Sequence, residues 1–214
     1  MSIKLDTFIN NINQATVFAY KSYWESIKPK SEKEFFLRWL FAILSVHTTW
    51  QNNLYAFNLL KDLKWTEDES DLNQKIIISK VGLNKNRSRA IWEIFNKFRI
   101  NPNFYYKENN ESWVNYRNRV SADTFMLGYA KTSFAISMCY PTENETICFD
   151  THILQLVNWD KDRSPTNKEY IKLEQDWISK CKLNNIPPSL SREIYWDGIQ
   201  KQDNSKYWTK CFEN

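Results

Sequence analysis

Apolar residues recur at helical spacing through most of the 214-residue chain. Glycine and proline, which interrupt helices, are rare inside these stretches. The pattern therefore predicts an all-α protein. The expected helices cover 6–27, 31–46, 50–63, 71–81, 88–98, a pair flanking the turn at 127–128, 151–157, 167–181 and 191–200.

Local signals place some of these boundaries. Lys28-Pro29-Lys30 closes the first expected helix, and Ser31 with Glu34 matches a capping box that opens the second. Residues 101–110 are polar and are expected to form a linker. No internal repeat or low-complexity tract interrupts the helical pattern.

Composition supports a globular protein with a substantial core, because 42% of the residues are hydrophobic and 16% are aromatic. The most apolar run, FFLRWLFAIL, is interrupted by Arg38, so no membrane span is expected. The N-terminal segment MSIKLDTFINN lacks the apolar core of a secretory signal. We therefore expect a protein that is not secreted and is cytoplasmic, nucleoid-associated or nuclear.

Several site classes are excluded by residue counts. Three glycines provide no glycine-rich phosphate loop, and two histidines provide no H-E-x-x-H zinc motif. The four cysteines show no C-x-x-C spacing, which predicts reduced thiols rather than a disulfide framework. We expect no metal and no cofactor. The net charge of +4 is compatible with a polyanionic partner but does not by itself indicate one.

Two short strings carry candidate chemistry. In FMLGYAKTSFAISMC, Lys131 follows a tight turn and begins a helix, where the positive end of the helix dipole favours loss of the ammonium proton. A neutral lysine amine can attack an electrophilic carbon such as C1′ of a deoxyribose and form a Schiff base. In TICFDTHILQLVNW, Asp150 is suited to cap the next helix and, in a cleft, to stabilise a cationic sugar. A solvated lysine and an ordinary capping aspartate are the structural alternatives.

These strings resemble the helix-hairpin-helix DNA glycosylase superfamily, which includes endonuclease III and the 8-oxoguanine glycosylase/lyases. Two further strings match in the same order: FAILSVHTT resembles the family's L-L-S-x-Q-T-T segment, and GLNKNRSRAI resembles its G-L-Y-x-x-K-A-x-x-I segment. The four strings together span residues 41–159. The resemblance implies that Lys131 is the nucleophile and Asp150 the catalytic carboxylate. The spacing between these two residues is slightly closer to the 8-oxoguanine branch.

The resemblance also implies DNA-binding residues. His47 stands where relatives place a glutamine that fills the space left by an extruded base, and Leu83 stands where a wedge enters the base stack. Arg87 occupies a basic position at that helix start, while Gly128 and Thr132 belong to the hairpin that contacts phosphate. The alternatives are a helix-end histidine, a core leucine and a solvated arginine. The hairpin departs from the family pattern L-P-G-V-G-x-K-T-A, because this chain has only one, displaced glycine there.

Endonuclease III relatives often hold an iron-sulfur cluster with four closely spaced cysteines after the catalytic aspartate. Only Cys181 and Cys211 follow Asp150 here, far apart, which predicts no cluster.

The resemblance thus implies two helical lobes, 31–139 with the hairpin and Lys131, and 1–30 plus 140–214 with Asp150, separated by a DNA-binding groove. The expected function is a bifunctional base-excision glycosylase and AP lyase, a monomer acting on double-stranded DNA that contains a lesion or abasic site. The excised base stays open among 8-oxoguanine, oxidised pyrimidines and mismatched or modified bases. A non-catalytic helix-hairpin-helix DNA-binding protein and an unrelated helical interaction protein are the alternatives.

Overall fold

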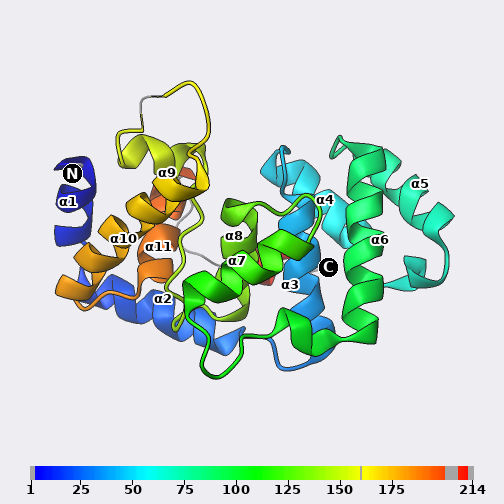
Figure 1. Cartoon of the computed structure of the whole chain (residues 1–214), viewed down its shortest axis with the longest axis horizontal. Helices are drawn as coiled ribbons and strands as arrows, with labels where there is room; N and C mark the ends of the chain where they lie inside the picture. Colours follow the sequence, from blue (N-terminus) through cyan, green and yellow to red (C-terminus); the bar gives the residue numbers. More distant parts are fainter. Residues whose placement is uncertain (1–2, 160, 201–206, 212–214) are drawn as a thin grey trace. The chain divides into compact units, whose positions relative to one another are not determined.

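The computed structural model describes residues 3–159, 161–200 and 207–211, and this part of the chain contains helices and no strand (Figure 1). The all-α prediction is confirmed. No helix within these ranges is both long and apolar enough to cross a membrane. The elements are, in order, α1 (Ile3–Asn10), α2 (Gln14–Ser26), α3 (Glu32–Leu44), α4 (Trp50–Leu60), η1 (Lys64–Glu67), α5 (Glu69–Ser79), α6 (Asn84–Ile100), η2 (Pro102–Tyr105), α7 (Trp113–Asp123), α8 (Tyr129–Cys139), α9 (Thr151–Leu156), α10 (Asn167–Leu183), α11 (Pro188–Gln200) and α12 (Tyr207–Lys210).

The chain forms two compact units. The first comprises Met1–Lys28 and Ile136–Phe212, and the second comprises Pro29–Ala135. The sequence had indicated lobes of 31–139 and of 1–30 plus 140–214. The division lies within α8, so the hairpin and Lys131 belong to the second unit and Asp150 belongs to the first.

Helix α3 is the centre of the second unit. Every residue from Phe35 to Leu44 is buried, Arg38 included, and α4 and α6 both pack against this helix. Helix α5 in turn packs against α4 and α6, as Figure 1 shows. A helix that is apolar on all sides is stable in water only when neighbours cover it, which explains the position of α3.

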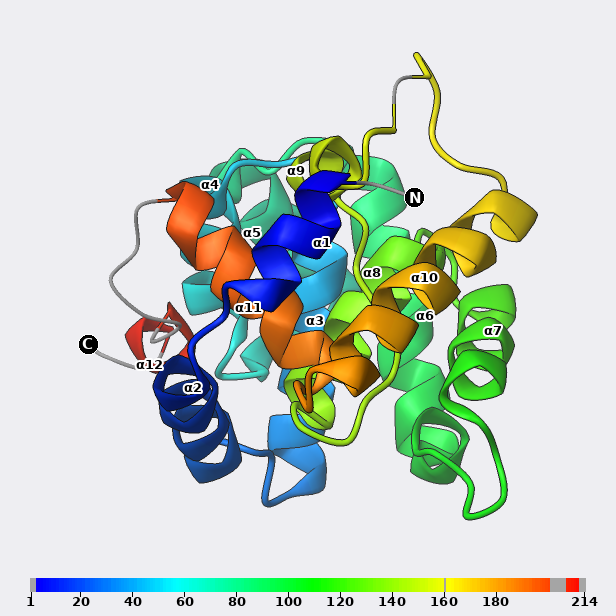
Figure 2. The same ribbon diagram turned by 90° about the vertical axis from the view of Figure 1, so that its left-hand side faces the viewer.

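Helix α11 has the corresponding place in the first unit, where it packs against α2, α9 and α10 (Figure 2). Aromatic side chains fill the space around it. Trp177 of α10 is fully buried, and its indole Nε1 donates to the hydroxyl of Ser191 on α11 over 2.8 Å. The ring of Phe149 meets Trp177 edge-on with centroids 6.0 Å apart.

The expected helix over 6–27 is wrong in one respect, because the structure has two helices there. Helix α1 ends at Asn10, and the side-chain oxygen of Asn13 accepts a hydrogen bond from the Ala15 amide over 2.7 Å to cap α2. Asparagine favours such caps over helix interiors because its short side chain bonds the local backbone. The apolar periodicity continues across the break between α1 and α2, so the periodicity alone does not predict it.

Two other local expectations are modified. Ser31 does cap α3 through the Glu34 amide, but the Glu34 carboxylate accepts the amide of Lys30 rather than that of Ser31. The polar stretch 101–110 contains the turn η2, in which Tyr105 is fully buried and its carbonyl accepts the Tyr116 hydroxyl. This stretch is therefore part of the packed unit rather than a free linker.

The packing of α6 yields a stability prediction. Ile94 is 1% exposed and Ile100, on the same helix, is 80% exposed. Ile94→Ala should lower the free energy of unfolding by about 3 kcal/mol, because it removes buried methylene groups and leaves a cavity. Ile100→Ala should change it by less than about 0.5 kcal/mol. Equal effects of the two substitutions in urea denaturation would contradict this account of the core.

Candidate active site

The turn between α7 and α8 is fixed by hydroxyl groups from both helices. The Leu127 carbonyl accepts the hydroxyl of Ser121 over 2.9 Å and that of Thr132 over 3.3 Å. Met126, at φ 69°, makes the left-handed bend. Gly128 is exposed, and apart from its own residue and its two chain neighbours no heavy atom lies within 4 Å of the place where a Cβ would stand. The backbone at Gly128 is therefore open to close approach by a ligand.

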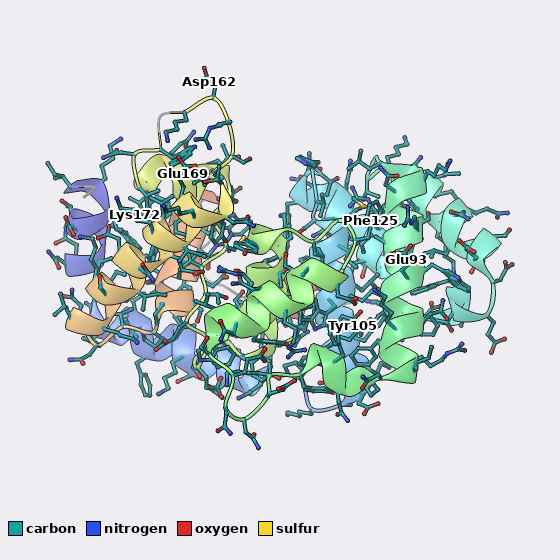
Figure 3. The ribbon with its side chains drawn as sticks, viewed as in Figure 1. Glu93, Tyr105, Phe125, Asp162, Glu169 and Lys172 are labelled. Atoms are coloured by element: carbon teal, nitrogen blue, oxygen red, sulfur yellow. The ribbon has the colours of Figure 1, made fainter. Side chains whose placement is uncertain are left out.

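The same turn is held to α6 by an aromatic contact. The guanidinium of Arg89 lies 4.5 Å from the ring centroid of Phe125 and donates to the Glu93 carboxylate over 2.6 Å. Figure 3 labels Phe125 on the turn and Glu93 on α6. Interactions from three helices thus set the position of the hairpin.

Lys131 lies in the first turn of α8 and is partly exposed. Its Nζ is 5.6 Å from the ring centroid of Phe134, which is buried and in turn packs against Phe41 of α3. The amine therefore sits against an apolar aromatic surface at a helix start. A ring face attracts a cation, whereas the positive end of a helix dipole opposes one.

Asp150 caps α9, as its position in the sequence indicates. Its Oδ1 accepts the amides of His152 and Ile153, each over 3.0 Å. Its Oδ2 accepts a 2.6 Å hydrogen bond from Arg192 of α11. The carboxylate is 22% exposed and Arg192 only 6%. Both oxygens thus have fixed partners, while the carboxylate stays partly exposed.

The segment leading to Asp150 is buried but not helical, so its backbone needs partners from elsewhere. Two side chains of α10 supply them. The Glu174 carboxylate accepts the Ile147 amide over 2.9 Å, and the Tyr170 hydroxyl donates to the Ile147 carbonyl while accepting the Phe149 amide over 3.3 Å. The direction of Asp150 is therefore set from α10 as well as from α9 and α11.

The sequence reasoning missed the charged cluster on α11. Arg192 bonds Asp150 with one amino group and the buried carboxylate of Glu193 with the other, at 3.1 and 3.2 Å. Asp197, also buried, accepts the Tyr20 hydroxyl over 2.8 Å. The available signal in the sequence was the group of charged residues in SREIYWDG, which lie within one expected helix.

His47 and Leu83 share an uncommon backbone state. Both are exposed, Leu83 by 46%, and both have a positive φ, 47° for His47 and 51° for Leu83. A left-handed conformation is unfavourable for residues other than glycine and persists only where neighbours enforce it. Leu83 is not the core leucine that the sequence left as an alternative.

Arg87 and Thr132 differ from the expected phosphate contacts. Arg87 is fully buried, and its guanidinium donates to five backbone carbonyls, so this cation is not presented to a ligand. Thr132 is also fully buried, with its hydroxyl bonded inside the turn. The polar groups of both side chains bond to backbone carbonyls of the protein, so these residues support the local backbone rather than contact a ligand.

No group of three or more histidine, cysteine, aspartate or glutamate side chains in the described ranges is placed to hold a metal ion. The four cysteines are separate buried thiols. Burial raises the pKa of the Cys181 thiol to about 11.

No protein-family model matches the sequence, and no curated protein matches it. Solved structures do match the fold. The 8-oxoguanine DNA glycosylase of Methanocaldococcus jannaschii superposes with a TM-score of 0.73 at 19% identity, covering 92% of each chain. The glycosylase/lyase of that organism in complex with a 15mer DNA containing 8-oxoguanine gives 0.72 at 17% identity, covering 92% of this chain and 96% of the other.

The 8-oxoguanine DNA glycosylase of Thermotoga maritima gives a TM-score of 0.76 at 13% identity, covering 94% of this chain and 98% of the other. The fold is therefore shared with these 8-oxoguanine DNA glycosylases over nearly the whole chain. The resemblance inferred from the sequence is confirmed at the level of the fold.

The buried cluster on α11 predicts a pH dependence of stability. Burial raises the pKa of Glu193 from 4.5 to about 7, against the favourable charge of Arg192 and with added repulsion from Asp197. The unfolded chain therefore releases this proton at lower pH than the folded chain. The contribution of Glu193 to the free energy of unfolding should fall as the pH rises from about 4.5 to about 7 and stay constant above.

Glu193→Gln removes this titration and keeps an oxygen that can accept from Arg192. The stability of the variant relative to the parent chain should increase between pH 4.5 and 7 and then level off. Urea denaturation across this range measures the difference in stability between the two proteins. Parallel pH profiles for the two proteins would refute the raised pKa.

Proposed function

We propose that this protein is a base-excision DNA glycosylase with AP lyase activity. The observation that carries the proposal is a fold shared with 8-oxoguanine DNA glycosylases over more than nine tenths of the chain, with a lysine after the hairpin turn and an aspartate capping α9. The substrate is double-stranded DNA with a lesion or an abasic site. Because the matched structures act on 8-oxoguanine, that base is the first candidate.

Lys131 is the proposed nucleophile. Its neutral Nζ attacks C1′ of the flipped nucleotide, the C1′–N glycosidic bond breaks, and the base leaves with the bonding electrons and gains a proton. Opening of the sugar ring then gives an imine between Nζ and C1′. Removal of a C2′ proton expels the 3′ phosphate and cuts the strand.

Asp150 is the proposed electrostatic partner of this reaction. A carboxylate beside the sugar stabilises the positive charge that develops as the base departs. Arg192 and the two α9 amides keep the carboxylate oriented, so little reorganisation is needed at the moment of reaction. The proposal requires the two units to present Lys131 and Asp150 to the same nucleotide.

DNA binding is assigned to the hairpin and to the two exposed left-handed residues. The open backbone at Gly128 and the amides that begin α8 are suited to a phosphate, because a helix start is positive. His47 and Leu83 are the proposed wedges that replace the stacking of the extruded base. Thr132 supports the turn from inside without touching DNA.

The first test is trapping of the imine with borohydride. The chain should form a covalent adduct with duplexes that contain an abasic site or the correct lesion, across a panel of 8-oxoguanine, oxidised pyrimidines and mismatched uracil or thymine. Lys131→Ala and Lys131→Arg should both abolish the adduct, since neither side chain can form the imine. DNA affinity should change by less than about threefold in Lys131→Arg, because the charge remains.

Lys64→Ala, which removes an exposed lysine of the same unit, is the control and should trap as the parent chain does. Trapping that persists in Lys131→Arg would assign the nucleophile to another residue. DNA binding without any adduct or base release across the panel would instead indicate the non-catalytic helix-hairpin-helix alternative.

Asp150→Asn separates the cap from the charge. Asparagine caps helices about as well as aspartate, so α9 should stay intact, while the ion pair with Arg192 is lost. Base release should slow on the order of 100-fold, as when a charge-stabilising group is removed. Asp162→Asn, in an exposed loop of the same unit (Figure 3), is the matched control. Excision by Asp150→Asn at the parent rate would leave Asp150 with a structural role only.

A further inference from the structure

Arg87 occupies an uncommon position for a charged side chain. It lies in the first turn of α6 and is fully buried. Its guanidinium donates to five backbone carbonyls: Nε to Gly82 (3.1 Å), Nη1 to Ile43 (2.7 Å) and Leu44 (3.0 Å), and Nη2 to Val46 (2.7 Å) and Val81 (3.0 Å). An arginine has five N–H donors, so the acceptors match its full capacity.

The five carbonyls belong to two separate segments. Residues 43–46 end α3 and lead directly into His47, while residues 81–82 lead directly into Leu83. The backbone amide of Arg87 also bonds the Leu83 carbonyl over 2.8 Å. One side chain therefore holds the main chain immediately before each of the two exposed left-handed residues.

The positive charge of the buried Arg87 guanidinium is compensated by the dipoles around it. The carbonyls that end α3 form the negative end of its dipole, which stabilises a cation. Burial lowers the pKa of Arg87 to about 10, so the guanidinium stays protonated at neutral pH. Asn52 of α4 also supports the segment before Leu83, because its side-chain amide donates to the Lys80 carbonyl over 3.1 Å.

We propose that Arg87 is a positioning residue that couples His47 and Leu83 into one preset pair of DNA wedges. This inference rests on the proposed function and adds to it the element that sets the wedges. Both residues have backbone conformations that neighbours must enforce, and the planar fork of Arg87 fixes the two segments relative to each other. Lysine cannot replace it, because a flexible ammonium has three donors and no fork.

The test compares excision from paired and unpaired DNA. Wedges matter only where a base must be extruded from a stacked duplex, so Arg87→Lys should lose roughly 10- to 100-fold in excision from duplex and little from a single-stranded lesion. Imine trapping at a single-stranded abasic site should stay near the parent level. Arg99→Lys, on the exposed end of the same helix, should act as the parent chain on both substrates.

A double-mutant cycle separates coupling from general loss of stability. If Arg87 acts through the wedges, adding Arg87→Lys to the His47→Ala/Leu83→Ala background should reduce duplex excision less than twofold further. The same proportional loss in both backgrounds, or equal losses on duplex and single strand, would overturn the proposal. If the Arg87 variants do not fold, Asn52→Ala decides: a duplex-specific loss supports the coupling and parent behaviour on both substrates overturns it.

Hydrogen exchange without DNA provides a readout that is independent of activity. Arg87→Lys should speed exchange at 45–48 and 80–84 while the core of α5 keeps its protection. Unchanged exchange at both segments would refute the clamp even if the chain is an active glycosylase. Failure of the proposed function has a different signature, in which the parent chain releases no base and forms no imine.

Discussion

Every buried backbone N–H and C=O group needs a hydrogen-bond partner, and in an all-helical protein this requirement is hardest to meet where helices end. The candidate site is made of such ends. Arg87 satisfies carbonyls at the end of α3 and before α6, Glu174 and Tyr170 satisfy the buried non-helical stretch before α9, and Asp150 satisfies two amides in the first turn of α9. The side chains that satisfy the backbone are therefore the ones that fix the candidate site residues in place.

Arg87 and Arg192, two of the buried arginines, are stabilised in different ways. Arg87 is surrounded by carbonyl dipoles, which do not titrate, so its surroundings stay constant across the physiological pH range. Arg192 instead bridges two carboxylates, Asp150 and Glu193, and the second has a pKa raised to about 7 by burial. The charge balance around Asp150 thus depends on pH, whereas the segments next to His47 and Leu83 are held by contacts that do not.

Local sequence signals anticipated much of the architecture. Helical periodicity located the main helices because each has an apolar face to bury, and the cap at Asp150 followed from an aspartate placed just before an apolar helix. The break at 11–13 was missed because periodicity continues through it and only the cap of Asn13 marks it. Buried Tyr105 was missed because its neighbours in the sequence are polar.

The sequence by itself determined the helical class, the order of the motif strings and the candidate residues Lys131 and Asp150, since these depend on spacing along the chain. Only the tertiary structure decided which of the candidate side chains are buried and which are exposed. Arg87 and Thr132 look like surface residues in the sequence, yet both are fully buried, and Leu83 is exposed although leucine is usually a core residue. The reason is that partners such as the Ile43 and Val46 carbonyls lie more than forty positions from Arg87 and become its neighbours only when α3 packs against α6.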